Sequence, residues 1–96
     1  MIKSIKGKTT EDIFNGVNSK VSRKLPGILH PKARRLLDLI NGAQYLGDLN
    51  IPPGNKLEAL KGKLSGFYSI RINDQLRIIF RWFEGDADDV EIMDYH

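Results

Sequence analysis

The chain has no cysteine among its 96 residues, so it forms neither disulfides nor thiolate metal sites, as is typical of proteins in a reducing compartment. No apolar run approaches the roughly 20 residues of a membrane span, and the first ten residues lack the apolar core of a signal peptide. Only two histidines are present, and no GxSxG, P-loop or HExxH spacing occurs. These absences predict a soluble, cytoplasmic protein that contacts no membrane and whose chemistry needs no metal and no cofactor.

The length of the chain supports one small domain over residues 1–96, with a single core. Residues 1–35 carry nine Lys/Arg against two Asp/Glu, a local charge of +7, whereas residues 66–96 carry three against seven, a local charge of −4. A basic surface attracts polyanions such as nucleic acid, although charge also simply keeps small proteins soluble. The most basic connector of the chain contains three candidate contacts to a phosphate backbone, namely Lys20, Arg23 and Lys24.

Hydrophobic periodicity predicts a strand, two helices and then consecutive strands. Consecutive strands joined by short turns are antiparallel, and two amphipathic helices cover one face of such a sheet. We therefore expect an α+β fold in the order β-α-α-β-β-β-β, with a small antiparallel or mixed sheet and both helices packed on one face. The expected elements are an edge strand at residues 1–6, a helix from Thr9 or Thr10, a helix from Pro31 to Asn41, and strands at 56–61, within 66–83 and at 89–95.

Residues 66–83 alternate apolar and polar side chains and break once, at residues 73–75, as in a β-hairpin. If Ile72 lies opposite Leu76 across this three-residue loop, one face of the hairpin is wholly apolar. A two-residue loop would instead place Arg77 in the core, where an unpaired guanidinium costs several kcal/mol. We therefore predict the first register, whose apolar face carries Tyr68, Ile70, Ile72, Leu76, Ile78, Phe80 and Trp82.

The same register places Arg71 directly across from Arg77 on the second face of the hairpin. Two like charges opposite one another destabilise a sheet unless an anion lies over them. Arginine offers a planar fork of donors that suits phosphate. The hairpin alone is equally compatible with arginines that bind phosphate and with arginines that spread into water.

The sequence ends in three polar side chains, Asp94, Tyr95 and His96, for which a tail without a role is the simplest interpretation. Histidine titrates near neutrality and serves as an acid or a base, and an aspartate can orient it. One metal-free reaction uses these groups together with cations, namely cleavage of RNA by its own 2′-hydroxyl. The candidate groups are Arg71, Arg77 and Lys61 as cations and Glu58 and His96 for proton transfer.

Three segments, PPGNKLEALKG, SIRINDQLRIIFRW and the final VEIMDYH, resemble the HigB toxins, a branch of the RelE/ParE superfamily of bacterial toxin–antitoxin systems. The likeness spans nearly the whole chain and includes the order of elements expected above. It implies a fold like that of the microbial RNases and a toxin that enters the ribosomal A site and cleaves the translated mRNA without a metal. It also implies a HigA-like antitoxin with a helix-turn-helix domain, through which alone the toxin reaches operator DNA.

The resemblance also implies roles for individual residues. The catalytic Asp-Tyr-His of the family matches the end of this chain, with His96 as the acid, Asp94 orienting it and Tyr95 stacking on a base. Some relatives have a histidine where this chain has Glu58, which is a candidate general base.

The arginines of the hairpin match the cationic positions of the family. Arg77, Arg71 and Lys61 match its phosphate-binding positions. Two other functions stay open beside the nuclease. The gyrase-directed ParE branch inhibits a protein without catalysis on the same fold, and a plain RNA-binding domain would hold RNA without cutting it.

Overall fold

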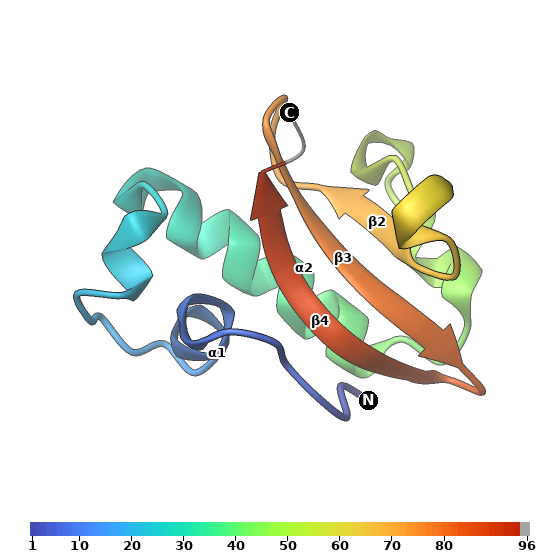
Figure 1. Ribbon diagram of the computed structural model, residues 1–96, viewed down its shortest axis with the longest axis horizontal. Coiled ribbons are helices and arrows are strands. Elements are labelled where there is room, and N and C mark those ends of the chain that lie inside the picture. Colours follow the sequence, from blue (N-terminus) through green and yellow to red (C-terminus); the bar gives the residue numbers. More distant parts are fainter. Residues whose placement is uncertain (95–96) are drawn as a thin grey trace.

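The structure is a computed structural model and describes residues 1–94. These residues form two α-helices followed by four consecutive strands, which make one antiparallel sheet in chain order (Figure 1). The helices are α1 (Lys8–Phe14) and α2 (His30–Gly42). The strands are β1 (Glu58–Ala59), β2 (Tyr68–Arg71), β3 (Leu76–Phe83) and β4 (Asp86–Asp94). Short 3-10 turns lie at Ser22–Lys24, Gly27–Leu29, Leu46–Asn50, Pro53–Asn55 and Gly62–Leu64.

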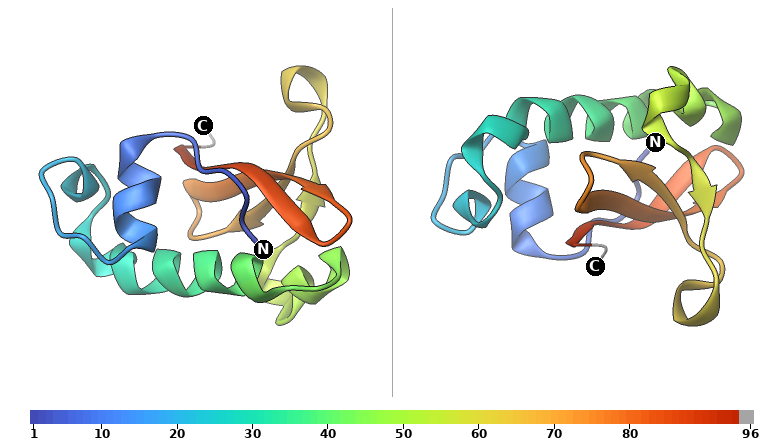
Figure 2. Two further views of the ribbon diagram at one scale, coloured as in Figure 1. Left: turned by 90° about the horizontal axis from the view of Figure 1, so that it is seen from below. Right: turned by 90° about the horizontal axis from the view of Figure 1, so that it is seen from above.

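Helix α2 lies across one face of the sheet, and α1 packs beside α2 next to β4 (Figure 2). This arrangement confirms the expected α+β fold with the helices on one side. The core joins the apolar stripe of α2 to the apolar face of the sheet, because residues at i, i+3, i+4 and i+7 share one side of a helix. Within residues 1–94, no helix is long and apolar enough to cross a membrane. The fully buried core residues include Leu36, Leu37 and Ile40 of α2 and Ile70, Ile78, Phe80 and Val90 of the sheet.

The hairpin of β2 and β3 has the predicted register. The backbone N–H of Ile72 donates to the carbonyl of Leu76 at 2.9 Å, and Arg71 lies directly opposite Arg77. Asn73 closes the loop, since its Oδ1 accepts a hydrogen bond from the N–H of Leu76 at 2.7 Å. The turn chemistry therefore agrees with the apolar alternation of the strands about which residues are paired.

The segment before α1 differs from the predicted edge strand. Ile2 and Ile5 form isolated parallel bridges to Ala87 and Val90 of β4, so the segment lies along the sheet edge without being a regular strand. The backbone N–H of Ile2 donates a hydrogen bond to Oδ1 of Asn41 in α2 at 2.9 Å. The N-terminal segment therefore joins the helix layer to the sheet.

The two outer strands differ from their predicted ranges. The strand expected at residues 56–61 contracts to the two residues of β1, because Lys56 has left-handed backbone angles (φ 49°, ψ 59°) and a 3-10 turn begins at Gly62. Strand β4 begins at Asp86, three residues earlier than expected. Asp89 has φ 52° and lies where the register with β3 shifts, which identifies a β-bulge.

The face of the sheet opposite α2 is called here the arginine face, and it carries Ser69, Arg71, Arg77, Ile79 and Arg81. This face is less open than the sequence predicts, because Arg77 is only 8% exposed and Ser69 and Ile79 are buried. The N–H of Leu60 donates to the carbonyl of Phe67 at 2.8 Å, and strand alternation places both side chains on this face. The interpretation of arginines spread into water is therefore wrong for Arg77.

Candidate active site

The register of the sheet determines which side chains meet on the arginine face. Directly opposed residues of antiparallel strands share a face, so they form rows that cross the strands. The exposed carboxylate of Glu58 belongs to the row next to the two paired arginines. One row consists of Arg71, Arg77 and Met93, and its neighbour consists of Glu58, Ser69, Ile79 and Glu91.

Arg77 is a buried cation with a fixed orientation. Its Nε donates to the hydroxyl of Ser69 at 2.7 Å, and its Nη2 donates to the backbone carbonyl of Lys56 at 2.6 Å. Ser69 is fully buried on β2, and Lys56 follows the 3-10 turn that ends at Asn55. Because arginine stays charged at all physiological pH values, these contacts hold a permanent positive charge in one place.

Arg71 is more accessible than Arg77, with 30% of its side chain exposed. Its guanidinium forms an ion pair with Asp74 in the hairpin loop, three residues further along. Asp74 is almost fully exposed, and an exposed ion pair of this kind is weak because water screens it. The chain itself thus supplies an anion to Arg71, one of the two paired arginines.

Glu58 and Lys61 lie on the edge of the sheet formed by β1. Both side chains are exposed. Lys61 comes directly before the 3-10 turn at Gly62, beyond the end of β1, so it is three positions from Glu58, about 10 Å along an extended chain. Glu58 is therefore associated with the arginine pair by the register, whereas Lys61 lies beyond the end of β1.

The end of β4 holds the first of the three predicted C-terminal residues. Asp94 lies opposite Leu76, and its Oδ2 accepts a hydrogen bond from Nε2 of Gln75 at 2.8 Å. Alternation along β4 places Asp94 on the side of Ile92, which faces α2 rather than the arginines. Tyr95 and His96 lie outside the residues that the structure describes, so their catalytic roles stay predictions.

The cation Arg81 extends the arginine face beyond the predicted site. Its guanidinium carbon lies 4.2 Å from the centroid of the Phe67 ring, and its Nε lies 3.5 Å from the carboxylate of Asp89. Gly66 has φ 93°, and a Cβ at this position would lie 3.2 Å from Nη1 of Arg81. Glycine therefore suits both the backbone angle and the close approach of this guanidinium.

The basic connector that contains Lys20, Arg23 and Lys24 does not join this site. It lies between α1 and α2, at the opposite end of the molecule from β1 and β2 (Figure 1). Of the three side chains, Arg23 donates to Oδ1 of Asn18 at 3.3 Å. The structure thus brings together Arg71, Arg77 and Glu58 and separates them from the connector.

The carboxylates in the first part of β4 contact other groups of the chain. Asp86 lies 3.4 Å from the N-terminal ammonium group, and Asp88 accepts a hydrogen bond from Ser4 at 3.3 Å. Asp89 pairs with Arg81, as described above. In the part of the chain that the structure describes, no three His, Cys, Asp or Glu side chains converge as metal ligands would.

Two contacts of the site were missed by the sequence analysis, namely Ser69 and the Lys56 carbonyl. Ser69 is a small polar residue on the same face as Arg77 and next to it, and this pattern alone could have identified it. The main-chain carbonyl of Lys56 leaves no such signal, because any residue type supplies one.

Known protein families and relatives agree with the fold and the site described above. The family model described as RelE-like toxin of type II toxin-antitoxin system HigB matches residues 3–96. The chain is 39% identical over 87 residues to Toxin HigB-1 of Vibrio cholerae, covering 91% of this chain and 90% of the relative. It is 35% identical over 97 residues to Endoribonuclease HigB of Proteus vulgaris, covering 100% of both chains.

Solved structures support the fold. A chain of the heterotetrameric YoeB–YefM toxin–antitoxin complex from Staphylococcus aureus superposes with a TM-score of 0.62 at 23% identity, covering 100% of this chain and 95% of that one. YafQ from E. coli gives a TM-score of 0.59 at 15% identity, with 99% and 92% covered. The fold is that of the RelE-like toxins. Within that class, the chain belongs to the HigB family of type II toxin–antitoxin systems, and its partner is accordingly an antitoxin.

Proposed function

We propose that this toxin is a ribosome-dependent mRNA endonuclease, which acts in the cytoplasm, enters the ribosomal A site and cleaves the mRNA being translated. The observation that carries the proposal is the buried guanidinium of Arg77, which Ser69 and the Lys56 carbonyl hold one row from the carboxylate-bearing residue Glu58. Membership of the HigB family and the name of the Proteus vulgaris relative, an endoribonuclease, support it.

The proposed reaction uses no metal and no cofactor. A base removes the proton of a ribose 2′-hydroxyl, and the 2′-oxygen then attacks the adjacent phosphorus. The bond from phosphorus to the 5′-oxygen breaks, and an acid protonates that oxygen, so the products are a 2′,3′-cyclic phosphate and a free 5′-hydroxyl. Negative charge builds up on the non-bridging oxygens during attack, and cations that are already in position stabilise it without reorganisation.

The proton transfers are assigned to Glu58 and His96. Glu58 is proposed as the base because its exposed side chain shares a face with Arg77. His96 is proposed as the acid, since histidine titrates near neutral pH. Asp94 would orient His96, and Tyr95 would stack on a base of the mRNA.

The cations of the arginine face are assigned to the phosphates. Arg77 would contact the reacting phosphate, because its orientation is fixed before the substrate arrives. Arg71 would contact it as well, with the RNA displacing the exposed Asp74 from a weak ion pair. Lys61 would bind a neighbouring phosphate at the β1 edge.

The antitoxin is proposed to be a HigA-like protein with a helix-turn-helix domain. In this arrangement the toxin would contact operator DNA only through its partner. Membership of a toxin–antitoxin family supports an antitoxin, and the domain type follows from the family resemblance.

The nuclease proposal is tested by incubating the purified protein with translating ribosomes and mapping new mRNA 5′ ends by primer extension. The wild type should produce such ends, and Arg77→Ala should lower the rate about 10²- to 10³-fold. His96→Ala should abolish growth arrest in cells. Lys3→Ala, an exposed cation of the N-terminal segment, is the control and should leave cleavage unchanged.

Two results would contradict the nuclease. One is the absence of new 5′ ends with the wild-type protein and ribosomes. The other is growth arrest that survives His96→Ala and is accompanied by DNA damage, which would favour the gyrase inhibitor. RNA that is bound in a salt-dependent manner and left intact would indicate a binding domain instead.

A further inference from the structure

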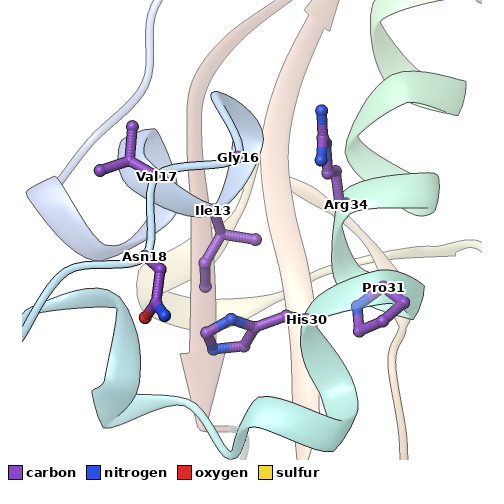
Figure 3. A pocket seen from close by; sticks show the side chains of 7 residues that line it. All are labelled: Ile13, Gly16, Val17, Asn18, His30, Pro31 and Arg34. Atoms are coloured by element: carbon purple, nitrogen blue, oxygen red, sulfur yellow. The ribbon is translucent and has the colours of Figure 1, made fainter.

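A pocket of about 250 Å³ opens between the end of α1 and the start of α2 (Figure 3). Ile13, Val17 and Pro31 supply apolar walls, and Asn18, His30 and Arg34 supply polar groups. In the close-up, the side chains of Ile13, Asn18 and His30 point towards one another, whereas Val17 points outward. The pocket is thus formed by the part of the chain that the proposed active site leaves unused.

The surface around the pocket is strongly basic. Residues 16–35 contain six Lys/Arg and no Asp or Glu. Within residues 1–94, the carboxylates make no ion pair with any of these six cations, since the pairs that form involve other residues. A partner that brings carboxylates here would therefore meet charges that the chain itself has not neutralised. The six cations are Lys20, Arg23, Lys24, Lys32, Arg34 and Arg35.

The connector beside the pocket is held in place by a network that begins in α1. The buried carboxylate of Asp12 accepts a hydrogen bond from the Ser19 hydroxyl at 2.6 Å. Ser19 and Ser22 then bond reciprocally, with each backbone N–H donating to the hydroxyl of the other at 2.9 and 3.0 Å. A surface that is ordered before binding loses less entropy when a partner docks.

The pocket wall also depends on a close approach between the helices. Gly16 has φ 71°, and a Cβ at this position would lie 2.9 Å from Nη1 of Arg34. The glycine therefore allows the guanidinium to lie against the end of α1. His30 also lines the pocket, and its Nε2 donates a hydrogen bond to the carbonyl of Leu25 at 2.9 Å.

Apolar exposure indicates which class of macromolecule fits this surface. Val17 is 48% exposed at the pocket, and Ile28, two residues before His30, is 87% exposed. Phosphate groups gain nothing from aliphatic side chains, whereas protein interfaces combine an apolar centre with a charged rim. The combination of a pocket, exposed aliphatic residues and cations that form no ion pair within residues 1–94 therefore favours an acidic protein segment over RNA.

We propose that this surface is the docking site of the antitoxin. An acidic segment of the antitoxin would insert an aliphatic side chain between Ile13 and Val17 and bring carboxylates to Arg34 and to the cations of the connector. The proposal requires only the antitoxin partner that the family assigns, and it does not depend on the nuclease reaction.

The test measures binding of the purified cognate antitoxin by titration calorimetry at low and high salt. The double variant Lys24→Glu/Arg34→Glu should weaken the affinity about 100-fold or more, because it places like charges against the acidic segment. Val17→Glu should weaken it about 10-fold through loss of the apolar contact. Lys63→Glu, at the exposed 3-10 turn beyond β1, is the matched charge reversal and should change it less than about 3-fold.

Circular dichroism and thermal unfolding show whether the variants are folded. If the double variant is not, Lys20→Ser/Lys24→Ser replaces two exposed side chains and should still weaken binding about 10-fold. Antitoxin affinity that is unchanged in the folded variants would overturn the proposal. The same unchanged affinity with reduced co-sedimentation with ribosomes would assign the surface to RNA instead. Either result is independent of whether the wild-type protein cleaves mRNA.

Discussion

Replacement of Ser69 by alanine tests whether Arg77 acts only when its guanidinium is held in place. The Ser69 side chain is fully buried, and its hydroxyl accepts the hydrogen bond from Arg77 Nε at 2.7 Å. Alanine removes this acceptor and little else, while the bond from Nη2 to the Lys56 carbonyl, at 2.6 Å, is retained. In the proposed mechanism Ser69 is thus a positioning residue, which would act through Arg77 without touching the RNA.

The expected loss follows from the strength of this hydrogen bond. A hydrogen bond to a charged group contributes roughly 1.5–3 kcal/mol, and each 1.4 kcal/mol corresponds to a factor of about ten. Since part of this free energy is lost equally from the ground state and the transition state, we expect Ser69→Ala to lower kcat about 10-fold. Removal of the whole Arg77 guanidinium should cost more, about 10²- to 10³-fold. KM should change less than about 3-fold, because the variant leaves Arg71, the other proposed phosphate contact, unchanged.

Cleavage rates measured over a range of mRNA-programmed ribosome concentrations separate kcat from KM. Ser69→Thr is the matched control, since it keeps the hydroxyl and adds a methyl group that a strand accommodates, and it should restore most of the rate. Thermal unfolding of both variants establishes that they are folded at the assay temperature. A Ser69→Ala protein that cleaves at the wild-type kcat would refute the positioning role.

Three further predictions concern the core, the connector and the base. Leu36→Ala should lower the free energy of unfolding by about 2–5 kcal/mol, measured in urea, and a loss below about 1 kcal/mol would mean that the site collapses around the cavity. The Ser19 hydroxyl and Lys8 hold the pKa of Asp12 below its usual value of 3.8, so Asp12 stabilises the fold above that pH and the stabilisation is lost as the pH falls through the lowered pKa. The urea midpoints of Asp12→Asn and wild type should therefore differ at pH 7 and converge in acid; a constant difference would contradict this. Glu58→Gln should lower kcat and remove the base-dependent limb of its pH profile, and an unchanged profile would exclude Glu58 as the base.

The register of the hairpin could be predicted, although one reason given for it was incomplete. The alternative register was rejected because it buries Arg77 without a partner. Arg77 proves to be buried in the favoured register as well, at 8% exposure, but with Ser69 and the Lys56 carbonyl as partners. Apolar alternation identified the correct pairing because it involves seven side chains at once, whereas the environment of one arginine depends on residues that are distant in sequence.

The parts that could not be predicted depend on backbone conformation and on tertiary placement. The left-handed angles of Lys56 shorten β1, and nothing in a lysine side chain indicates them. The bulge at Asp89 likewise shifts the pairing of β4 without an apolar signal. Charge alone made the connector around Lys24 a candidate phosphate-binding segment, like the arginines of the hairpin. The connector lies between α1 and α2, and this tertiary placement separates it from the arginine face.

The Lys56 carbonyl has a consequence for how this protein tolerates mutation. Because the acceptor of Arg77 Nη2 belongs to the main chain, side-chain replacement at position 56 should leave it intact, and glycine suits the left-handed angles there. The vulnerable residue is instead Asn55, whose buried amide donates to the carbonyls of Leu49 and Ile51 at 3.1 and 3.4 Å and so shapes the turn. In a library selected for survival of the host cell, inactive toxins should carry changes at Asn55 far more often than at Lys56, although Lys56 is the residue that Arg77 contacts.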